Sequence, residues 1–263
     1  MSRVAIVTGG SSGIGYCAAA ALRNAGCTVY EFSRRESPPP GVAHIYADVT
    51  DPQSIRTAVD QVMQREGRID ILVNNAGFGI SGAAEFTTAG QAHRQMEVNL
   101  FGMANTTQAV LPHMRAAGGG RIVNLSSIAA ITPIPFQTWY SVSKAAINAY
   151  TMAAANEVRP FGITMCAVMP GDVRTGFTDA RCKADDGDSV YGGAIGRSVG
   201  KMEKDERGGM APERIGALIC RVALKKRVHP FYSAGIGYKM VMFLVKILPA
   251  GVLRRLVGLL YAA

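Results

Sequence analysis

The sequence is poor in cysteine and histidine and has no long apolar run. Its 263 residues include five cysteines and four histidines. The cysteines are scattered with no C-x-x-C pair, a pattern typical of reduced, buried thiols in a cytosolic protein rather than of a disulfide framework. The histidines show no metal-ligand spacing, so we expect no metal site. No stretch of about 18 apolar residues is present, which argues against a transmembrane helix.

Acidic residues are outnumbered by basic ones, 19 against 28, and the formal net charge is +9. This charge indicates an anionic partner: a phosphate-bearing cofactor, an acidic substrate or a membrane surface. The basic residues form no dense stripe with interleaved aromatics, so we expect no nucleic-acid partner. The run Val4–Val7 already reads as a short buried strand, so we expect no leader segment and a cytoplasmic location.

Apolar runs of strand length alternate with helical patterns along most of the chain. This alternation predicts a single α/β domain with a doubly wound parallel sheet of about seven strands and helices on both faces. The strand-like runs are Val4–Val7, Thr28–Phe32, His44–Tyr46, Ile69–Val73, Arg121–Leu125 and Ile163–Met169, with a further candidate near Val228–Tyr232. The helical patterns are Gly15–Ala25, Pro52–Glu66, Ala89–Ala117, Tyr140–Val158 and Pro212–Leu224.

Two regions depart from this alternation. Residues from about 175 to 210 are polar and glycine-rich, and a loop of this length in a compact domain is typical of a functional lid or a mobile segment. We therefore predict a main domain over residues 1–235 that includes this lid. Residues 236–263 form an apolar and basic helical extension. The extension could lie in a membrane interface with Lys246, Arg254 and Arg255 toward the headgroups, cover the substrate cleft, or pack between subunits.

A glycine-rich turn follows the first predicted strand and opens the first predicted helix. It reads Thr8-Gly9-Gly10-Ser11-Ser12-Gly13-Ile14-Gly15. The glycines permit a tight turn and a close backbone approach, and the helix N-terminus presents free N–H groups to a pyrophosphate. The order strand, glycine-rich turn, helix is the context that this phosphate-binding function requires.

Tyr140 and Lys144 lie four residues apart, and Ser127 lies thirteen residues before Tyr140. The spacing of four places the phenol and the ammonium on one helix face. A free tyrosine has a pKa of about 10, and a nearby ammonium favours the phenolate and lowers that pKa. A serine hydroxyl from a strand end could hold a substrate oxygen against the phenol. The three residues therefore predict proton transfer to or from a substrate oxygen.

Together these motifs resemble the compact branch of the short-chain dehydrogenase/reductase family. The resemblance rests on Thr8-Gly9-x-x-x-Gly13-x-Gly15, Asn74-Asn75-Ala76-Gly77, Asn99, Ser127, Tyr140-x-x-x-Lys144 and Pro170-Gly171, in family order. It covers about residues 3–177 strongly and implies a Rossmann-like fold, a nicotinamide cofactor and a homodimer or homotetramer. It also implies the catalytic set Asn99, Ser127, Tyr140 and Lys144, with Asn99 holding a water that relays protons to Lys144.

The residues after the second predicted strand indicate which nicotinamide cofactor is bound. An acidic residue there would accept hydrogen bonds from the adenosine ribose and favour NAD. The chain has Ser33 at that position, followed by Arg34 and Arg35, and guanidinium suits a 2′-phosphate. We therefore predict NADP(H). The predicted cofactor-binding residues are Gly9, Ser11, Ser12, Gly13, Ile14, Gly15, Ser33, Arg34, Arg35, Asp48, Val49, Asn75, Ala76, Gly77, Tyr140, Lys144, Pro170, Gly171, Val173 and Thr175.

The substrate side contains mainly apolar residues. Ile131, Ile134, Pro135 and Phe136 precede Tyr140 and fit either an apolar pocket or a core or subunit contact. The sequence resembles most the family members that act on steroids, retinoids or lipid ketones, in particular the 17β-hydroxysteroid dehydrogenase-like group. We thus expect an NADP(H)-dependent ketone–alcohol oxidoreductase acting on a bulky apolar substrate. The alternatives are a 3-oxoacyl thioester reductase and a catalytically silent NADPH-binding sensor or scaffold.

Overall fold

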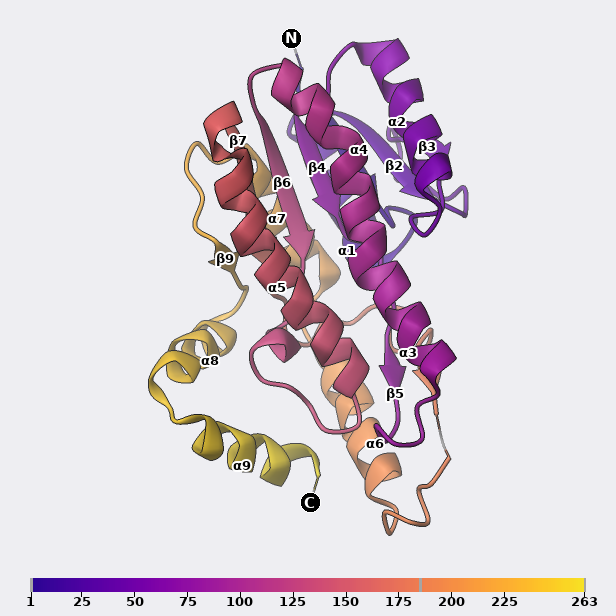
Figure 1. The fold of residues 1–263 in the computed structure, drawn as a ribbon, viewed down its shortest axis with the longest axis vertical. Helices are drawn as coiled ribbons and strands as arrows, with labels where there is room; N and C mark the ends of the chain where they lie inside the picture. The colour runs from indigo at the N-terminus through magenta and orange to yellow at the C-terminus, as the bar shows by residue number, and fades with distance from the viewer. Residues whose placement is uncertain (1, 185, 263) are drawn as a thin grey trace.

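Seven short parallel strands form the centre of the molecule, in the order β3-β2-β1-β4-β6-β7-β9 (Figure 1). The computed structural model describes residues 2–184 and 186–262. The sheet matches the predicted doubly wound α/β architecture. Its strands are β1 (Val4–Thr8), β2 (Thr28–Ser33), β3 (Ala43–Tyr46), β4 (Ile71–Asn74), β6 (Gly120–Leu125), β7 (Ile163–Val168) and β9 (Phe231–Tyr232).

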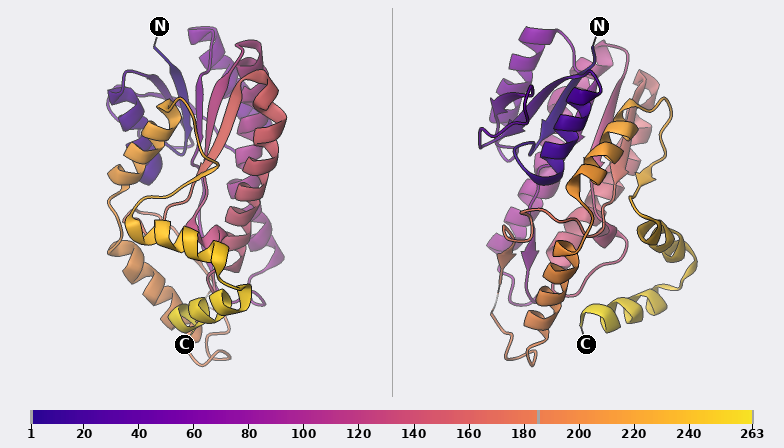
Figure 2. Two further views of the ribbon diagram at one scale, coloured as in Figure 1. Left: turned by 90° about the vertical axis from the view of Figure 1, so that its left-hand side faces the viewer. Right: turned by 180° about the vertical axis from the view of Figure 1, so that it is seen from behind.

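Helices cover both faces of this sheet, as predicted (Figure 2). One face packs against α1 (Gly13–Asn24) and α7 (Pro212–Leu224), and the other against α2 (Pro52–Glu66), α4 (Gly102–Ala116) and α5 (Thr138–Val158). Side chains alternate along each strand, so Val4 and Ile6 of β1 enter the second core while Ala5 and Val7 enter the first. Strands buried on both faces explain the uninterrupted apolar runs of the sequence.

The predicted helix Ala89–Ala117 is interrupted in the structure. It consists of α3 (Ala89–Met96), a π-helical turn Glu97–Phe101 and α4. A π-turn inserts one residue into the helical repeat, a local change that apolar periodicity does not reveal. The interruption is relevant to function because it contains Asn99.

The predicted lid is more ordered than its composition suggests. It contains β8 (Cys182–Lys183), which pairs with β5 (Ile80–Ser81), and the helix α6 (Ala194–Arg207). The carboxylate of Asp188 accepts hydrogen bonds from the backbone N–H groups of Ile195 and Gly196, at 3.0 and 3.1 Å. Asp188 therefore caps α6 from outside the N-cap position, which Gly193 occupies, so a local N-cap pattern does not predict this helix.

The last part of the chain forms two helices, α8 (Ile236–Ile247) and α9 (Ala250–Tyr261), separated by a turn at Leu248 and Pro249. Figure 1 and Figure 2 show them in yellow at the edge of the molecule, beyond the sheet. Within residues 2–184 and 186–262, no helix combines the length and the apolar character needed to cross a membrane.

Candidate active site

The glycine-rich turn joins β1 to α1 and depends on three of its glycines. Gly9 and Gly13 have φ angles of +66° and +55°, a region that favours glycine. A Cβ on Gly15 would lie 2.2 Å from the carbonyl oxygen of Gly9, so only glycine fits beneath the turn. In the described chain, the Ser12 side chain makes no capping hydrogen bond. The first N–H groups of α1 are therefore available to a phosphate, as the cofactor prediction requires.

A second loop, after β4, is hydrogen-bonded to β1 and to this turn. The side chain of Asn75 donates hydrogen bonds to the carbonyl oxygens of Thr8 and Gly9, at 3.0 and 3.1 Å. The hydroxyl of Thr8 in turn accepts from the backbone N–H groups of Asn75 and Ala76. Because β1 and β4 are neighbours at the point where the strand order reverses, this pair of loops forms the crevice in which doubly wound folds bind ligands.

The end of this crevice next to β2 carries basic side chains. Arg34 lies 3.8 Å from the carboxylate of Asp48, and Arg35 donates to the hydroxyl of Ser12 over 3.4 Å. Burial would raise the pKa of Asp48, but hydrogen bonds from Thr50 and the charge of Arg34 together hold it below its usual value. Glu31 is fully buried and pairs with His44, outside the crevice. Arg34, Arg35 and Ser33 line the crevice, so this end has cationic chemistry suited to a phosphate.

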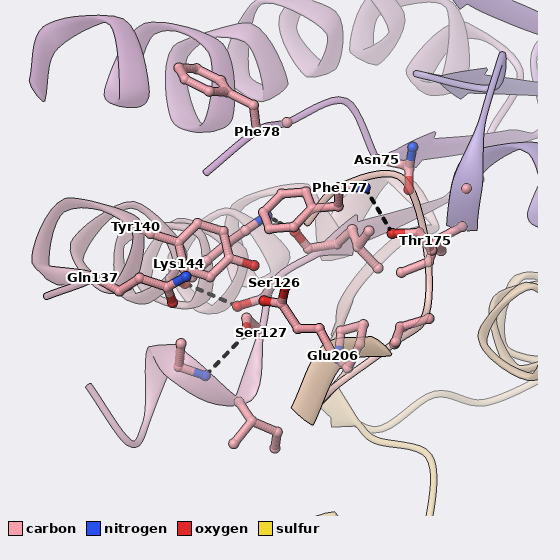
Figure 3. Close-up of a pocket in the computed structure, with 18 of the residues that line it drawn as sticks. Asn75, Phe78, Ser126, Ser127, Gln137, Tyr140, Lys144, Thr175, Phe177 and Glu206 are labelled. Carbon is pink, nitrogen blue, oxygen red and sulfur yellow. Dashed lines mark hydrogen bonds between the residues drawn. The ribbon is translucent and has the colours of Figure 1, made fainter. Parts of the chain in front are cut away.

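Ser127, Tyr140 and Lys144 come together at the centre of the cavity (Figure 3). Tyr140 and Lys144 extend from α5, and the ammonium nitrogen of Lys144 lies 5.6 Å from the centre of the Tyr140 ring. Lys144 also donates to the carbonyl oxygen of Leu125 at 2.8 Å. Ser127 follows β6, accepts from the backbone N–H of Ala129 at 3.1 Å, and lies near enough to the Tyr140 phenol to lower its pKa.

Burial controls the proton affinities of this group. It raises the pKa of Tyr140 to about 12, and the hydroxyl of Ser127 offsets only part of this shift. Burial also lowers the pKa of Lys144 to about 8. The sequence predicts a lowered tyrosine pKa beside Lys144, whereas in this structure desolvation raises it. A phenol with a raised pKa holds its proton at neutral pH, which suits an acid that protonates a substrate oxygen.

Asn99 lies behind the cavity instead of in its wall. Its side-chain amide donates to the carbonyl oxygen of Phe78 and to the hydroxyl of Ser143, both at 3.1 Å, and accepts from the backbone N–H of Phe78 at 3.0 Å. These bonds fasten the loop after β4 to the π-turn and to α5. The side chain of Asn99 therefore positions the loop, and its part in a proton relay stays a prediction.

The predicted cofactor and catalytic residues line one cavity of about 1380 Å³, with two exceptions. Gly15 and Asn99 lie outside the lining, where they shape the turn and the loop. The residues in the wall are Gly9, Ser11, Ser12, Gly13, Ile14, Ser33, Arg34, Arg35, Asp48, Val49, Asn75, Ala76, Gly77, Ser127, Tyr140, Lys144, Pro170, Gly171, Val173 and Thr175.

The substrate end of the cavity includes side chains that no motif marked. The ring of Phe177 lies 5.7 Å from that of Tyr140. Glu206, on α6, accepts a hydrogen bond from the hydroxyl of Thr178 at 2.6 Å and pairs with Arg181. Figure 3 shows its carboxylate directed toward the side of the cavity that holds Ser127 and Tyr140. Glu206 lies in the predicted lid, whose mixed charges look like ordinary solvated surface in the sequence.

The C-terminal extension also forms part of this wall. Apolar residues of both helices and of the turn between them line the cavity: Val241, Leu244, Val245, Leu248, Leu253, Leu256, Val257 and Leu260. Tyr238 fixes α8 in place, because its hydroxyl donates to the carboxylate of Asp172 at 2.6 Å and its ring packs on Gly171. Of the three uses expected for the extension, covering the substrate cleft is the one that this contact supports. Among the apolar residues before Tyr140, Ile134 lines the cavity, whereas Phe136 packs against Tyr191.

Comparisons with known proteins agree with this geometry. The sequence model of the family described as short chain dehydrogenase matches residues 3–186. A 3-ketodihydrosphingosine reductase from Bacteroides thetaiotaomicron is 42% identical over 238 residues, which cover 89% of this chain and 88% of the relative. A 2-(R)-hydroxypropyl-CoM dehydrogenase from Xanthobacter autotrophicus is 37% identical over 196 residues, 69% of this chain and 78% of the relative.

A solved structure extends the likeness to three dimensions. The crystal structure of a short-chain dehydrogenase from Streptomyces avermitilis, 31% identical, superposes with a TM-score of 0.81 over 92% of this chain and 91% of its own. The family match covers the glycine-rich turn, Ser127, Tyr140 and Lys144. The chain therefore belongs to the short-chain dehydrogenase family and is an oxidoreductase that uses a nicotinamide cofactor.

Proposed function

We propose that this protein uses NADPH to reduce the ketone of a long-chain lipid to a secondary alcohol. The observation that carries the proposal is the continuous cavity, which runs from the glycine-rich turn past Tyr140 to the apolar wall of α8 and α9. A ketone held at Tyr140 then has the cofactor site on one side and room for an alkyl chain on the other.

In this reaction each group has a defined task. The nicotinamide, when bound, supplies a hydride that forms the new C–H bond at the carbonyl carbon. The hydroxyl of Ser127 holds the carbonyl oxygen, and the phenol of Tyr140 donates its proton to that oxygen as negative charge develops. The ammonium of Lys144 stabilises the phenolate that remains. The products are the alcohol and oxidised cofactor, and the phenolate regains its proton from solvent.

The lipid character of the substrate rests on the cavity wall and on one relative. Steroids, retinoids and lipid ketones all fit an apolar wall, but the 42% identical relative is named for 3-ketodihydrosphingosine, an amino ketone with a long alkyl chain. A carboxylate at the substrate end of the cavity, Glu206, would complement an ammonium beside the ketone. These two observations support a long-chain amino ketone as the substrate class.

NADP(H) as the cofactor rests on Arg34 and Arg35, with Ser33 in place of an acidic residue. We expect Arg34→Ala to raise the KM for NADPH about tenfold or more, because a charge-assisted hydrogen bond to the 2′-phosphate is worth about 1.5–3 kcal/mol. The KM for NADH, which lacks that phosphate, should change little. Steady-state kinetics with both cofactors measure this difference. Equal losses with NADPH and NADH would remove the argument for phosphate recognition.

Lys144 should impose a pH dependence on reduction. Its pKa of about 8 means that it is charged below that pH and loses its charge above it. The phenolate formed from Tyr140 is then less stabilised, so kcat/KM for reduction should fall about tenfold per pH unit above pH 8. The profile is measured from pH 6 to 10. In Lys144→Met the rate should be low and this limb should vanish, while Lys226→Met, at an exposed lysine, should keep it. The same limb in Lys144→Met would assign the ionisation to another group.

A screen of NADPH consumption tests the function as a whole. The panel contains long-chain 3-keto amines, the same ketones without the amine, steroids, retinal and acetoacetyl thioesters. We expect the highest kcat/KM with a long-chain ketone. Preference for the thioester would favour a 3-oxoacyl thioester reductase, and NADPH binding without any turnover would favour a sensor or scaffold. Either result would overturn the proposal.

A further inference from the structure

The helix α8 carries an apolar stripe on its outer surface. Ile236, Met240, Phe243 and Ile247 recur at the spacing of one helix face, and their exposed fractions are 79%, 58%, 63% and 60%. Large apolar side chains this exposed and this regularly spaced on one helix are rare on the free surface of a soluble domain. The stripe therefore indicates a surface that is covered in the working protein.

The stripe does not serve to attach α8 to the domain. The opposite side of the helix does this, since Tyr238, Val241 and Val245 line the cavity. The two sets of residues lie on opposite sides of the helix, at about 100° per residue. The helix α8 is thus apolar on two sides, and only the inner side has a partner in the described chain. The inner contacts account for its position without the outer stripe.

The helix α9 is also apolar and exposed. Leu253 and Val257 line the cavity, Leu256 and Leu260 line it while 46% and 58% exposed, and Val252 and Leu259 lie outside its lining, 43% and 72% exposed. Every residue from Ile236 to Tyr261 is at least partly exposed. Figure 2 shows the two helices lying beyond the sheet, at the edge of the molecule.

The charge around these helices identifies the chemistry of the surface that covers them. From residue 214 to the C-terminus the sequence has no Asp or Glu. Lys239 and Lys246, both exposed, lie along one edge of the stripe on α8. Apolar side chains bordered by lysines are typical of helices that lie in the interface of an anionic bilayer. The nine basic residues of this segment are Arg214, Arg221, Lys225, Lys226, Arg227, Lys239, Lys246, Arg254 and Arg255.

A second copy of the chain fits this surface less well. In a twofold interface the same patch meets itself, so the basic edges of both copies would contribute to one interface. That segment has no acidic side chain to pair with them, and like charges brought together oppose association. An anionic lipid surface has the opposite charge and also accepts the apolar stripe.

We propose that α8 and α9 seat the protein on an anionic membrane, with the stripe in the boundary between headgroups and acyl chains. The helices then lie in the plane of the membrane and do not cross it. Their inner sides still line the catalytic cavity, so one layer of helix separates the cavity from the lipid. If the proposed function holds, only this layer of helix lies between a lipid ketone in the membrane and Tyr140; the docking itself does not depend on that function.

Vesicle flotation of the full-length protein tests this docking. We expect the protein to float with vesicles of phosphatidylcholine and phosphatidylserine, less with phosphatidylcholine alone, and less as NaCl is raised. The double variant Phe243→Ser/Ile247→Ser should reduce binding to the anionic vesicles at least tenfold. A matched control, Tyr46→Ser/Val190→Ser, changes residues that are 62% and 73% exposed on other elements and should bind as the wild type does.

Folding and oligomeric state are measured on the same samples. NADPH binding by fluorescence should be equal in all variants, since Phe243 and Ile247 lie outside the cavity lining. Absence of wild-type binding to anionic vesicles would overturn the proposal, as would equal losses in the stripe variant and the control. A dimer that dissociates in the stripe variant while vesicle binding is unchanged would assign the stripe to a second copy instead. A negative substrate screen leaves these outcomes unaffected.

Discussion

Tyr140→Phe should reduce kcat by at least about a hundredfold while NADPH still binds. The change removes only the hydroxyl that donates a proton to the substrate oxygen, and positioned proton transfer of this kind contributes about 10²–10⁴-fold. Because burial raises the pKa of Tyr140 to about 12, the wild-type phenol is fully protonated at neutral pH and ready to act as an acid. Phenylalanine keeps the ring that contacts Phe177, so the cavity should retain its shape.

The measurement compares single-turnover NADPH oxidation with NADPH binding by fluorescence. Tyr150→Phe is a matched control, because Tyr150 lies on the same helix α5 but packs against the core and is outside the cavity lining. The control should keep wild-type kcat. A loss of less than about tenfold in Tyr140→Phe, equivalent to about 1.4 kcal/mol, would mean that another group protonates the oxygen.

Much of this site could be predicted because its signals are local. The turn Gly9–Gly15 needs glycine for its own backbone, so a short run of adjacent residues is enough to predict it. Tyr140 and Lys144 share a helix face through a spacing of four. Parallel strands end at one edge of the sheet, which brings Asn75 and Ser127 to the same side as the glycine-rich turn. The resemblance to a known family then assigned these separate motifs to one active site.

Other features depend on packing that no local pattern records. The raised pKa of Tyr140 follows from desolvation inside the cavity, whereas the sequence shows only a nearby lysine and predicts a shift in the opposite direction. Asn99 lies in a π-helical turn that apolar periodicity does not reveal, and its side-chain oxygen accepts a hydrogen bond from the backbone N–H of Phe78. Tyr238 reaches Asp172 across 66 residues of chain. Such contacts are products of the finished fold, and single-sequence periodicity does not contain them.

The substrate head group provides the second large prediction. Glu206 lies in the cavity wall with 15% of its side chain exposed, and each of its oxygens already accepts one hydrogen bond, from Thr178 or Arg181. A carboxylate oxygen has two acceptor sites, so both oxygens can accept a further donor from the substrate. The positive charge of Arg181 lies against the carboxylate of Glu206, and this attraction offsets the desolvation cost of burying Glu206. An ammonium beside the ketone would add a further charge-assisted bond.

We therefore expect Glu206→Gln to raise the KM for a long-chain 3-keto amine about 10–100-fold, since a hydrogen bond to a charged group is worth about 1.5–3 kcal/mol. The KM for the same ketone without the amine should change less than about threefold. Glutamine keeps the size of the side chain, an oxygen that can accept from Arg181 and an amide N–H that can donate to the hydroxyl of Thr178, so α6 should stay in place. Steady-state kinetics with the paired ketones measure the difference.

The neighbouring residue Glu203 offers a matched control on α6. It pairs with Lys183 at 2.6 Å, away from the cavity lining, and Glu203→Gln should leave both KM values unchanged. If Glu206 only held the lid through Thr178 and Arg181, its replacement would impair both ketones equally. Equal losses would thus contradict recognition of an amine but leave the reduction of a lipid ketone intact. A selective loss with the amino ketone would make Glu206 the residue that distinguishes a sphingoid-type ketone from other apolar carbonyls.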